Sequence, residues 1–389
     1  DGRENLSKAK KYIIKQSIYK EAPNNVIFIP TDYNIRILEN FGKIVNALIK
    51  EWWYKISTSK NIEKYKWELE EYRKNLKPGD ITLLGLITEG GQGLATANNG
   101  KYIGVLEGTK WAEKVRKERP DKLLLATDFC KKNNIKTKQD AIEFLEDLNE
   151  KEIRELFDKI KEKYGRDIFG QGWIYRIVSE NEIADVENLT DDEKMNGIKG
   201  KRTFVPYDKG DKEGNRWYAP TPYYIDWSRE NVKALQTDPK ARWQGYQFYF
   251  REGFCWNNVT GEKIICRLKE KSVHSTEAMT FISVVKILPD FFLVCLLNSN
   301  FFSYYKNLFL NVTVHLTTGD AKEFPIIIPT ATELAAFEKI FNRAYTIQKQ
   351  KFAGTITEAE AERELEEVQR ELDKMVEEMY MGKVTKKEN

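Results

Sequence analysis

The chain has 389 residues, of which 41% are hydrophobic and 32% charged, and its net charge is +3. This composition is too apolar for a disordered protein and predicts a soluble protein of two or three packed units. Its apolar runs are shorter than the about 20 residues of a membrane helix, which argues against a membrane protein. The four cysteines form no CxxC pair and the N-terminus has no apolar signal region, so we expect a cytoplasmic protein.

Charge is distributed unevenly along the chain. Between Ile356 and Met381, ten acidic and three basic side chains give a net charge of −7, which leaves a surplus of ten positive charges elsewhere. A basic body with an acidic tail suits phosphate contact over a limited face, although an ordinary charged surface explains the same numbers.

Residues 1–78 are predicted to form a helical connector. From Ile35 to Trp52, apolar residues recur at spacings of three and four, which is typical of one buried helix face. A more polar helix follows over 61–75 and is closed by Pro78 and Gly79. The chain begins without Met in a lysine-rich stretch, so we expect it to be a fragment of a longer protein.

Residues 79–330 are predicted to form an α+β domain. A strand-like run over 81–87 leads into a loop over 88–103, and a charge-dense helical insertion follows over about 108–199. Apolar residues at helical spacing from Ala141 to Ile160 mark its amphipathic helices. Strand-like, aromatic-rich sequence resumes over 173–178 and dominates from 201 to about 329.

Residues 331–389 are predicted to be helical again. Between Ala361 and Met379, apolar side chains alternate spacings of four and three, as in a heptad seam. Such a seam packs either on its own domain or on a partner helix, and the sequence leaves both open.

The sequence lacks recognisable residues for methyl transfer, hydrolysis or metal binding. Gly90-Gly91-Gln92-Gly93 follows a strand-like run, but no helix is predicted to open after it, as a nucleotide-binding loop requires. The segment 219–224 lacks the polar group and paired prolines of an adenine-methylating loop and is predicted to be a turn entering a strand. His274 and His315 are far apart, and no cysteine cluster offers a zinc site. We therefore expect no catalytic residue, metal or cofactor in this chain.

Two stretches interleave cations with aromatic residues. The first runs over 201–210 and resumes at Arg216-Trp217-Tyr218, and the second runs over 248–256. Cations contact phosphates or guanine edges, and aromatic rings stack on bases. Each stretch alone is more typical of a β-sheet core with exposed charges, and only the combination favours a binding surface.

Four sequence blocks stand in a characteristic order over residues 80–329. They are Gly93 to Ile103, Lys209 to Trp227, Tyr249 to Trp256, and Leu296 to Ile326. The blocks are similar to a GLxTGxNxxF loop, a Y-x-K-G…xWYG…xxVVDW run, YFxxGIxWS and LLNSK…GD…PI, with Ala97 in place of the loop glycine. In this the chain resembles the C-terminal target-recognition region of type IIG restriction-modification enzymes and BREX-type adenine-specific DNA methyltransferases.

The resemblance implies recognition of double-stranded DNA for phage defence, while an upstream domain or subunit methylates adenine at N6 with S-adenosylmethionine. It points to DNA contacts from the first block, the cation–aromatic stretches and the loop before the closing strand. The candidate DNA-binding residues are Gly93, Thr96, Asn98, Asn99, Lys101, Lys201, Arg202, Tyr207, Lys209, Arg216, Trp217, Arg251, His315, Thr317 and Thr318. The expected scaffold residues are Phe248, Phe250, Leu296, Phe301 and Phe302.

Three alternatives remain at this level. A type I restriction specificity subunit is also a DNA reader with helical spacers, although such subunits usually carry two strand-rich modules and this chain shows one. A protein-binding scaffold would use the aromatic sheet and the acidic helix and would not bind duplexes in a salt-sensitive way. A nuclease within residues 1–78 has little support, because its acidic residues alternate with lysines as solvated helix pairs do.

Overall fold

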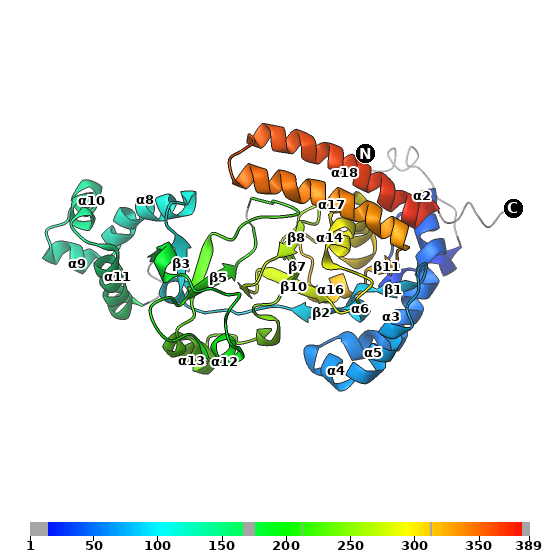
Figure 1. Cartoon of the computed structure of the whole chain (residues 1–389), viewed down its shortest axis with the longest axis horizontal. Helices are drawn as coiled ribbons and strands as arrows, with labels where there is room; N and C mark the ends of the chain where they lie inside the picture. The colour runs from blue at the N-terminus through cyan, green and yellow to red at the C-terminus, as the bar shows by residue number, and fades with distance from the viewer. Residues whose placement is uncertain (1–14, 166–175, 212, 312, 383–389) are drawn as a thin grey trace, which may run out of the picture.

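The structure is a computed structural model that describes residues 15–165, 176–211, 213–311 and 313–382. Figure 1 shows an elongated molecule with a larger lobe at one end and, at the other, a smaller lobe that carries the helical insertion. The predicted α+β class is confirmed, because both lobes combine helices with β-sheet. None of the described helices has the length and apolarity needed to cross a bilayer.

The N-terminal helices are packed into the larger lobe. Leu38, Phe41, Val45 and Trp52 of the predicted apolar face are buried in the same core as the C-terminal helices. The elements are turns at Gln16–Lys20 and Pro23–Asn25, α2 (Asp32–Ile37), a π-helical turn (Leu38–Gly42), α3 (Lys43–Ile56), α4 (Ser59–Lys64) and α5 (Lys66–Lys74). Residues 1–78 are therefore not a separate connector over the part that the structure describes.

Three sheets make up the described β-structure. The strands are β1 (Ile81–Leu83), β2 (Thr88–Gly91), β3 (Ile103–Leu106), β4 (Arg176–Val178), β5 (Phe204–Asp208), β6 (Tyr223–Asp226), β7 (Gly253–Asn257), β8 (Cys266–Lys269), β9 (Val273–His274), β10 (Ala278–Ser283) and β11 (Pro325–Ile327). The larger lobe holds the antiparallel pair β1-β11 and the antiparallel sheet β2-β10-β7-β8. The smaller lobe holds the mixed sheet β4-β3-β6-β5-β9.

The run over 81–87 is not one strand, as its composition had predicted. Only its first three residues pair with β11, and α6 (Leu84–Ile87) is a single helical turn before β2 begins. All four residues of α6 are buried, and a Cβ atom at Gly85 would lie 2.7 Å from the side chain of Lys322. The apolar run therefore reflects burial on all sides rather than the period of a strand.

The helical insertion forms a core of its own. Its helices are α8 (Lys110–Leu124), α9 (Thr127–Lys132), α10 (Lys138–Glu146) and α11 (Glu150–Tyr164). Ala141, Leu145, Ile153, Phe157 and Ile160 are buried there, which confirms the predicted amphipathic faces. The chain then returns to the smaller lobe through β4, and α12 (Asp191–Asn196) and α13 (Arg229–Thr237) cover its lower side (Figure 1).

The C-terminal helices complete the larger lobe. They are α14 (Asp290–Asn298), α15 (Asn300–Tyr305), a π-helical turn (Lys306–Leu310), α16 (Thr318–Lys322), α17 (Ala331–Phe352) and α18 (Glu358–Met381). Figure 1 shows α17 and α18 as a hairpin along the top of this lobe. Ala361, Val368, Leu372 and Met379 of the heptad seam are buried against α17 and α15. The seam therefore packs on its own domain.

Hydrophobic cores divide the chain differently from the predicted domains. One core joins the N-terminal helices, the sheet β2-β10-β7-β8 and α14 to α18, and a second lies around the five-stranded sheet. The predicted domain over 79–330 thus contributes to both lobes, because β7, β8 and β10 belong to the larger one. The scaffold residues Phe248, Phe250, Leu296, Phe301 and Phe302 are all buried, as predicted, and all four cysteines are buried and free.

Candidate nucleic-acid interface

Two loops that are far apart in the sequence lie side by side. One is the segment 91–99 after β2, and the other is the segment 238–252 between α13 and β7; we call them the paired loops. Ala95 and Arg242 exchange backbone hydrogen bonds of 3.1 and 2.9 Å, and the Gln244 side chain donates to the carbonyl of Gly93 at 3.1 Å. Figure 1 shows the first of these loops running along the lower side of the molecule from the larger lobe to the smaller.

The paired loops meet over His274, which ends β9. A Cβ atom at Gly93 would lie 1.9 Å from the carbonyl oxygen of His274, and one at Gly245 would lie 2.4 Å from the carbonyl oxygen of Gln92. Gly245 also has a φ of 68°, a left-handed conformation that glycine adopts without strain. Both positions therefore require glycine, because three backbone segments approach each other closely here.

His274 itself is buried and neutral. Its ring lies edge-on to Tyr249 with 5.5 Å between centroids, and neither ring nitrogen has a hydrogen-bond partner among the described residues. Burial and then the nearby charge of Lys269 lower the pKa of His274 to about 3. At neutral pH the imidazole is therefore an uncharged spacer beneath the paired loops.

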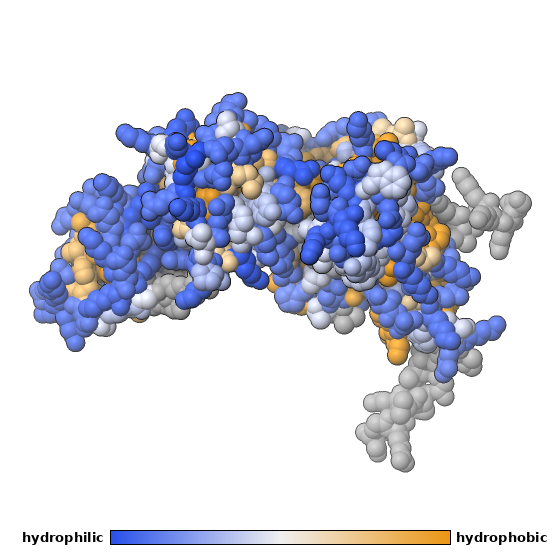
Figure 2. All heavy atoms as spheres, turned by 90° about the horizontal axis from the view of Figure 1, so that it is seen from below, coloured by the Kyte–Doolittle hydropathy of each residue, from blue (hydrophilic) through white to orange (hydrophobic). Residues whose placement is uncertain are grey.

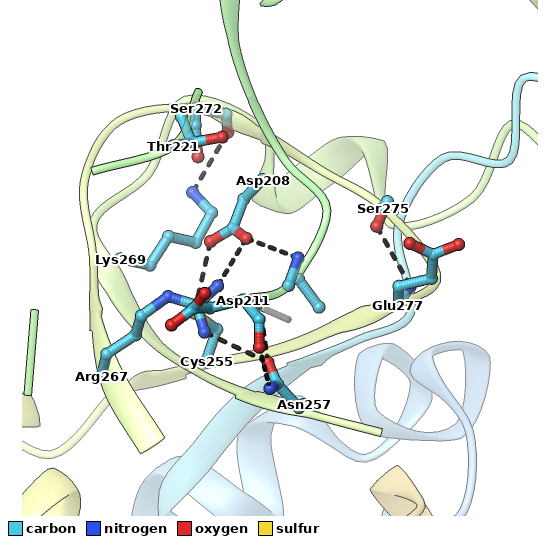
Figure 3. A network of polar contacts seen from close by, with 12 residues as sticks. Asp208, Asp211, Thr221, Cys255, Asn257, Arg267, Lys269, Ser272, Ser275 and Glu277 are labelled. Atoms are coloured by element: carbon cyan, nitrogen blue, oxygen red, sulfur yellow. Dashed lines mark hydrogen bonds and ion pairs between the residues drawn. The ribbon is translucent and has the colours of Figure 1, made fainter. Parts of the chain in front are cut away.

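A buried polar network beside His274 connects β5, β7 and β8 (Figure 3). Asp208 accepts hydrogen bonds from Arg267 at 2.7 Å, from the Gly210 amide at 2.9 Å and from the Cys255 thiol at 3.3 Å. Burial raises the pKa of the Asp208 carboxyl, but the Arg267 charge and these hydrogen bonds outweigh it, and the pKa lies below its usual value. The Lys269 ammonium donates to backbone carbonyls, the shortest of these bonds being 2.6 Å. Because its charges are paired internally, this network is a structural support of the sheet.

The glycine-rich segment 90–93 does not fit a nucleotide cofactor. A Cβ atom at Gly90 would lie 2.1 Å from the carbonyl oxygen of Thr280, so this glycine accommodates the neighbouring strand β10. A helical turn, α7 (Asn99–Tyr102), does follow the segment, contrary to prediction, but only after extended backbone that pairs with the second loop. Among the described residues, no group of His, Cys, Asp and Glu could hold a metal ion.

The outer face of the paired loops presents side chains suited to reading bases. Gln92, Arg242, Tyr246 and Gln247 are exposed, and Gln244 is partly exposed. In the major groove of DNA, arginine pairs with guanine edges and glutamine with adenine edges, in each case through two hydrogen bonds. Side chains of this kind can therefore distinguish base pairs.

Aromatic rings hold the second loop in place behind these side chains. Trp243 stacks on Trp227 with centroids 5.5 Å apart and on Tyr246 at 6.5 Å, both with an interplanar angle of 18°. Sequence reasoning missed this loop, because Arg242 and Gln244 lie about 150 positions from the segment that they join. The only local signal was the density of aromatic residues beside Arg242 over 241–250.

The lower side of the molecule is recessed between two protrusions. In Figure 1, α12 and α13 extend downward at one side and α4 and α5 at the other, and the loop after β2 crosses between them. Figure 2 views this side directly and shows a mostly hydrophilic surface that is hollowed between the protrusions. We call this hollow the recess.

Three predicted DNA contacts in the first block are partly exposed or exposed, and two are not. Thr96 is buried, where its hydroxyl donates to Asn99 Oδ1 at 2.5 Å and accepts from the Asn98 amide at 3.3 Å. Thr96 therefore shapes the turn, and Gly93 packs on His274, so neither is placed to touch a duplex. Asn98 and Asn99 are partly exposed and Lys101 is exposed, consistent with their proposed role.

The predicted contacts over 201–209 also divide by burial. Lys201 and Arg202 are exposed, although the Arg202 guanidinium donates to the carbonyl of Ile183 at 2.7 Å. Tyr207 is buried and its hydroxyl donates to the carbonyl of Leu94 at 2.9 Å, and Lys209 lies 3.5 Å from the Glu277 carboxylate with its side chain only 9% exposed. The predictions for Tyr207 and Lys209 are thus corrected to structural roles.

Arg216 and Trp217 face the C-terminal hairpin rather than the recess. The Arg216 guanidinium donates to the Gln369 side chain of α18 at 2.7 Å, and the buried indole of Trp217 lies edge-on to Phe341 of α17 at 6.2 Å. Trp217 is therefore not placed to contact DNA, whereas Arg216 is half-buried and engaged with α18. Their cation and ring instead fasten the loop after β5 to α17 and α18.

The remaining candidates lie on the larger lobe and at its edge. Arg251 is exposed, with its guanidinium 5.9 Å from the ring centroid of Phe248. His315 and Thr317 are exposed and Thr318 is partly exposed, and the Thr317 hydroxyl caps α16 by accepting from the Asp320 amide. His315, Thr317 and Thr318 therefore lie outside the paired loops, whereas Arg251 belongs to the second of them.

No protein family model matches the chain, and no curated protein matches it in sequence. The four motifs and the geometry of the paired loops are therefore the grounds for a functional proposal.

Proposed function

We propose that this chain recognises a sequence in double-stranded DNA for an adenine-specific (N6) DNA methyltransferase of a restriction-modification or related phage-defence system. The observation that carries the proposal is the outer face of the paired loops, where Arg242, Gln92 and Gln244 stand together on a rigid support. Methyl transfer from S-adenosylmethionine is assigned to an upstream domain or partner subunit, because the glycine-rich segment of this chain serves strand packing.

The deciding experiment is selection of bound duplexes from a randomised pool by the purified chain, at low and near-physiological salt, followed by sequencing. We expect one short motif to be enriched at both salt concentrations, because contacts to base edges survive conditions that weaken phosphate binding. Binding that enriches no motif and disappears at the higher salt would contradict the proposal and favour a protein-binding scaffold.

Substitution of Arg242 then locates the reading surface. Arg242→Ala is expected to cost about 1–3 kcal/mol on the selected duplex and to relax the base preference at one position of the motif. Arg343→Ala is the matched control, because Arg343 is an exposed arginine on α17 that pairs with Glu371. Equal losses on selected and scrambled duplexes would show that Arg242 contacts phosphate rather than a base.

A further inference from the structure

A second feature of the larger lobe is a set of exposed aromatic side chains on the N-terminal helices. Trp67 is 73% exposed, Tyr54 63% and Trp53 37%. Large exposed aromatics in a group mark interaction surfaces, because their burial by a partner removes apolar area from water. None of these residues belongs to the motifs that suggested DNA recognition.

Lysines lie on the same helices as these rings. Between Lys50 and Lys66 the chain carries five lysines and two glutamates, and Lys60, Lys64 and Lys66 are exposed. The rings of Tyr54 and Tyr65 lie 6.0 Å apart, and the Lys64 ammonium is 5.0 Å from the Tyr65 centroid. Cations interleaved with rings suit DNA, because its phosphates attract the cations and its sugars offer surface against which the rings can pack.

The position of these helices is fixed relative to the paired loops. Arg73 of α5 donates to the carbonyl of Leu86 at 2.7 Å and to the Glu89 carboxylate at 3.1 Å, and this ties α5 to the strand that leads into Gln92. Trp53 approaches Gly319 at the start of α16, next to the exposed loop that carries His315. The helices thus form one wall of the recess, and the paired loops lie beside it.

We propose that α3, α4 and α5 form a second DNA-contacting surface, which holds the phosphate backbone of the duplex that the paired loops read. This inference rests on the proposed function. The contacts are sequence-independent, since lysines bind phosphates as point charges and a ring that packs on a deoxyribose tolerates any sequence. A duplex in the recess is then held from the helical wall while the bases are read from the loops.

The test uses the full chain with Lys60, Lys64 and Lys66 all replaced by Gln. We expect affinity to fall about tenfold or more on selected and scrambled duplexes alike, with the ratio between them unchanged. The slope of log affinity against log salt should become shallower by about two to three. Binding of the variant no longer releases the counterions that the three lost phosphate contacts displace. The matched control replaces Lys131, Lys132 and Lys136, which are equally exposed lysines on the helical insertion.

The outcomes separate this inference from the proposed function. Sequence-selective binding with an unchanged affinity and salt slope in the Lys60, Lys64 and Lys66 variant would overturn the second surface and leave the proposed function standing. Absence of duplex binding by the unaltered chain would overturn both. If Tyr54→Ala with Trp67→Ala abolishes self-association measured by light scattering while DNA affinity is unchanged, the aromatic face is a protein contact and the inference is wrong. Circular dichroism of each variant checks that it is folded.

Discussion

At the scale of single residues, the pair of Asp208 and Arg267 carries opposite charges in a nearly dry interior, the side chains being 10% and 4% exposed, respectively. Removal of one partner leaves the other buried and uncompensated, so Arg267→Met is expected to lower the free energy of unfolding by about 3–5 kcal/mol. Urea denaturation measures this loss. The exposed pair of Arg343 and Glu371 provides the control, because Arg343→Ala should cost about 1 kcal/mol or less.

His274 predicts a dependence of stability on pH. Its folded pKa of about 3 lies below the roughly 6.5 of an unfolded histidine, so the unfolded chain takes up a proton first as the pH falls. The contribution of neutral His274 to the free energy of unfolding is therefore fully present above about pH 6.5. It decreases by about 1.4 kcal/mol per pH unit as the pH falls toward 3. Denaturation between pH 7 and 4 should show a shallower dependence for His274→Leu than for the unaltered chain. Equal slopes for His274→Leu and the unaltered chain would contradict the prediction.

At the scale of elements, the paired loops depend on close backbone packing. Gly93→Ala places a Cβ atom 1.9 Å from the His274 carbonyl oxygen, so the two loops must separate. We expect a loss of about 1–3 kcal/mol in unfolding free energy together with weaker binding of the selected duplex. Gly91→Ala is the control two residues away, since its Cβ atom would meet nothing within 4 Å. If both variants bind and unfold alike, the loops are not interlocked as described.

At the scale of the whole molecule, the acidic helix α18 lies away from the paired loops. It runs along the top of the larger lobe, whereas the loop after β2 crosses the lower side (Figure 1). Because salt screens exposed charges beyond about 8–10 Å, Glu364→Gln with Glu367→Gln should change DNA affinity less than about twofold near physiological salt. Filter binding at two salt concentrations checks this. A large gain in affinity would mean that DNA approaches the helical hairpin instead.

The sequence by itself determined the helices of the insertion, the aromatic scaffold and the heptad seam, because periodic burial is written locally in residues such as Ala141, Phe157 and Leu372. It also marked the first loop of the interface. Only the tertiary structure decided which polar side chains face solvent. Thr96 and Tyr207 are buried, whereas Arg242 is exposed. The physical reason is that the local sequence shows which residues are polar, whereas the exposure of each side chain depends on segments distant in the chain. At the paired loops, for example, the close approach of Gly93, Gly245 and His274 brings two distant segments together.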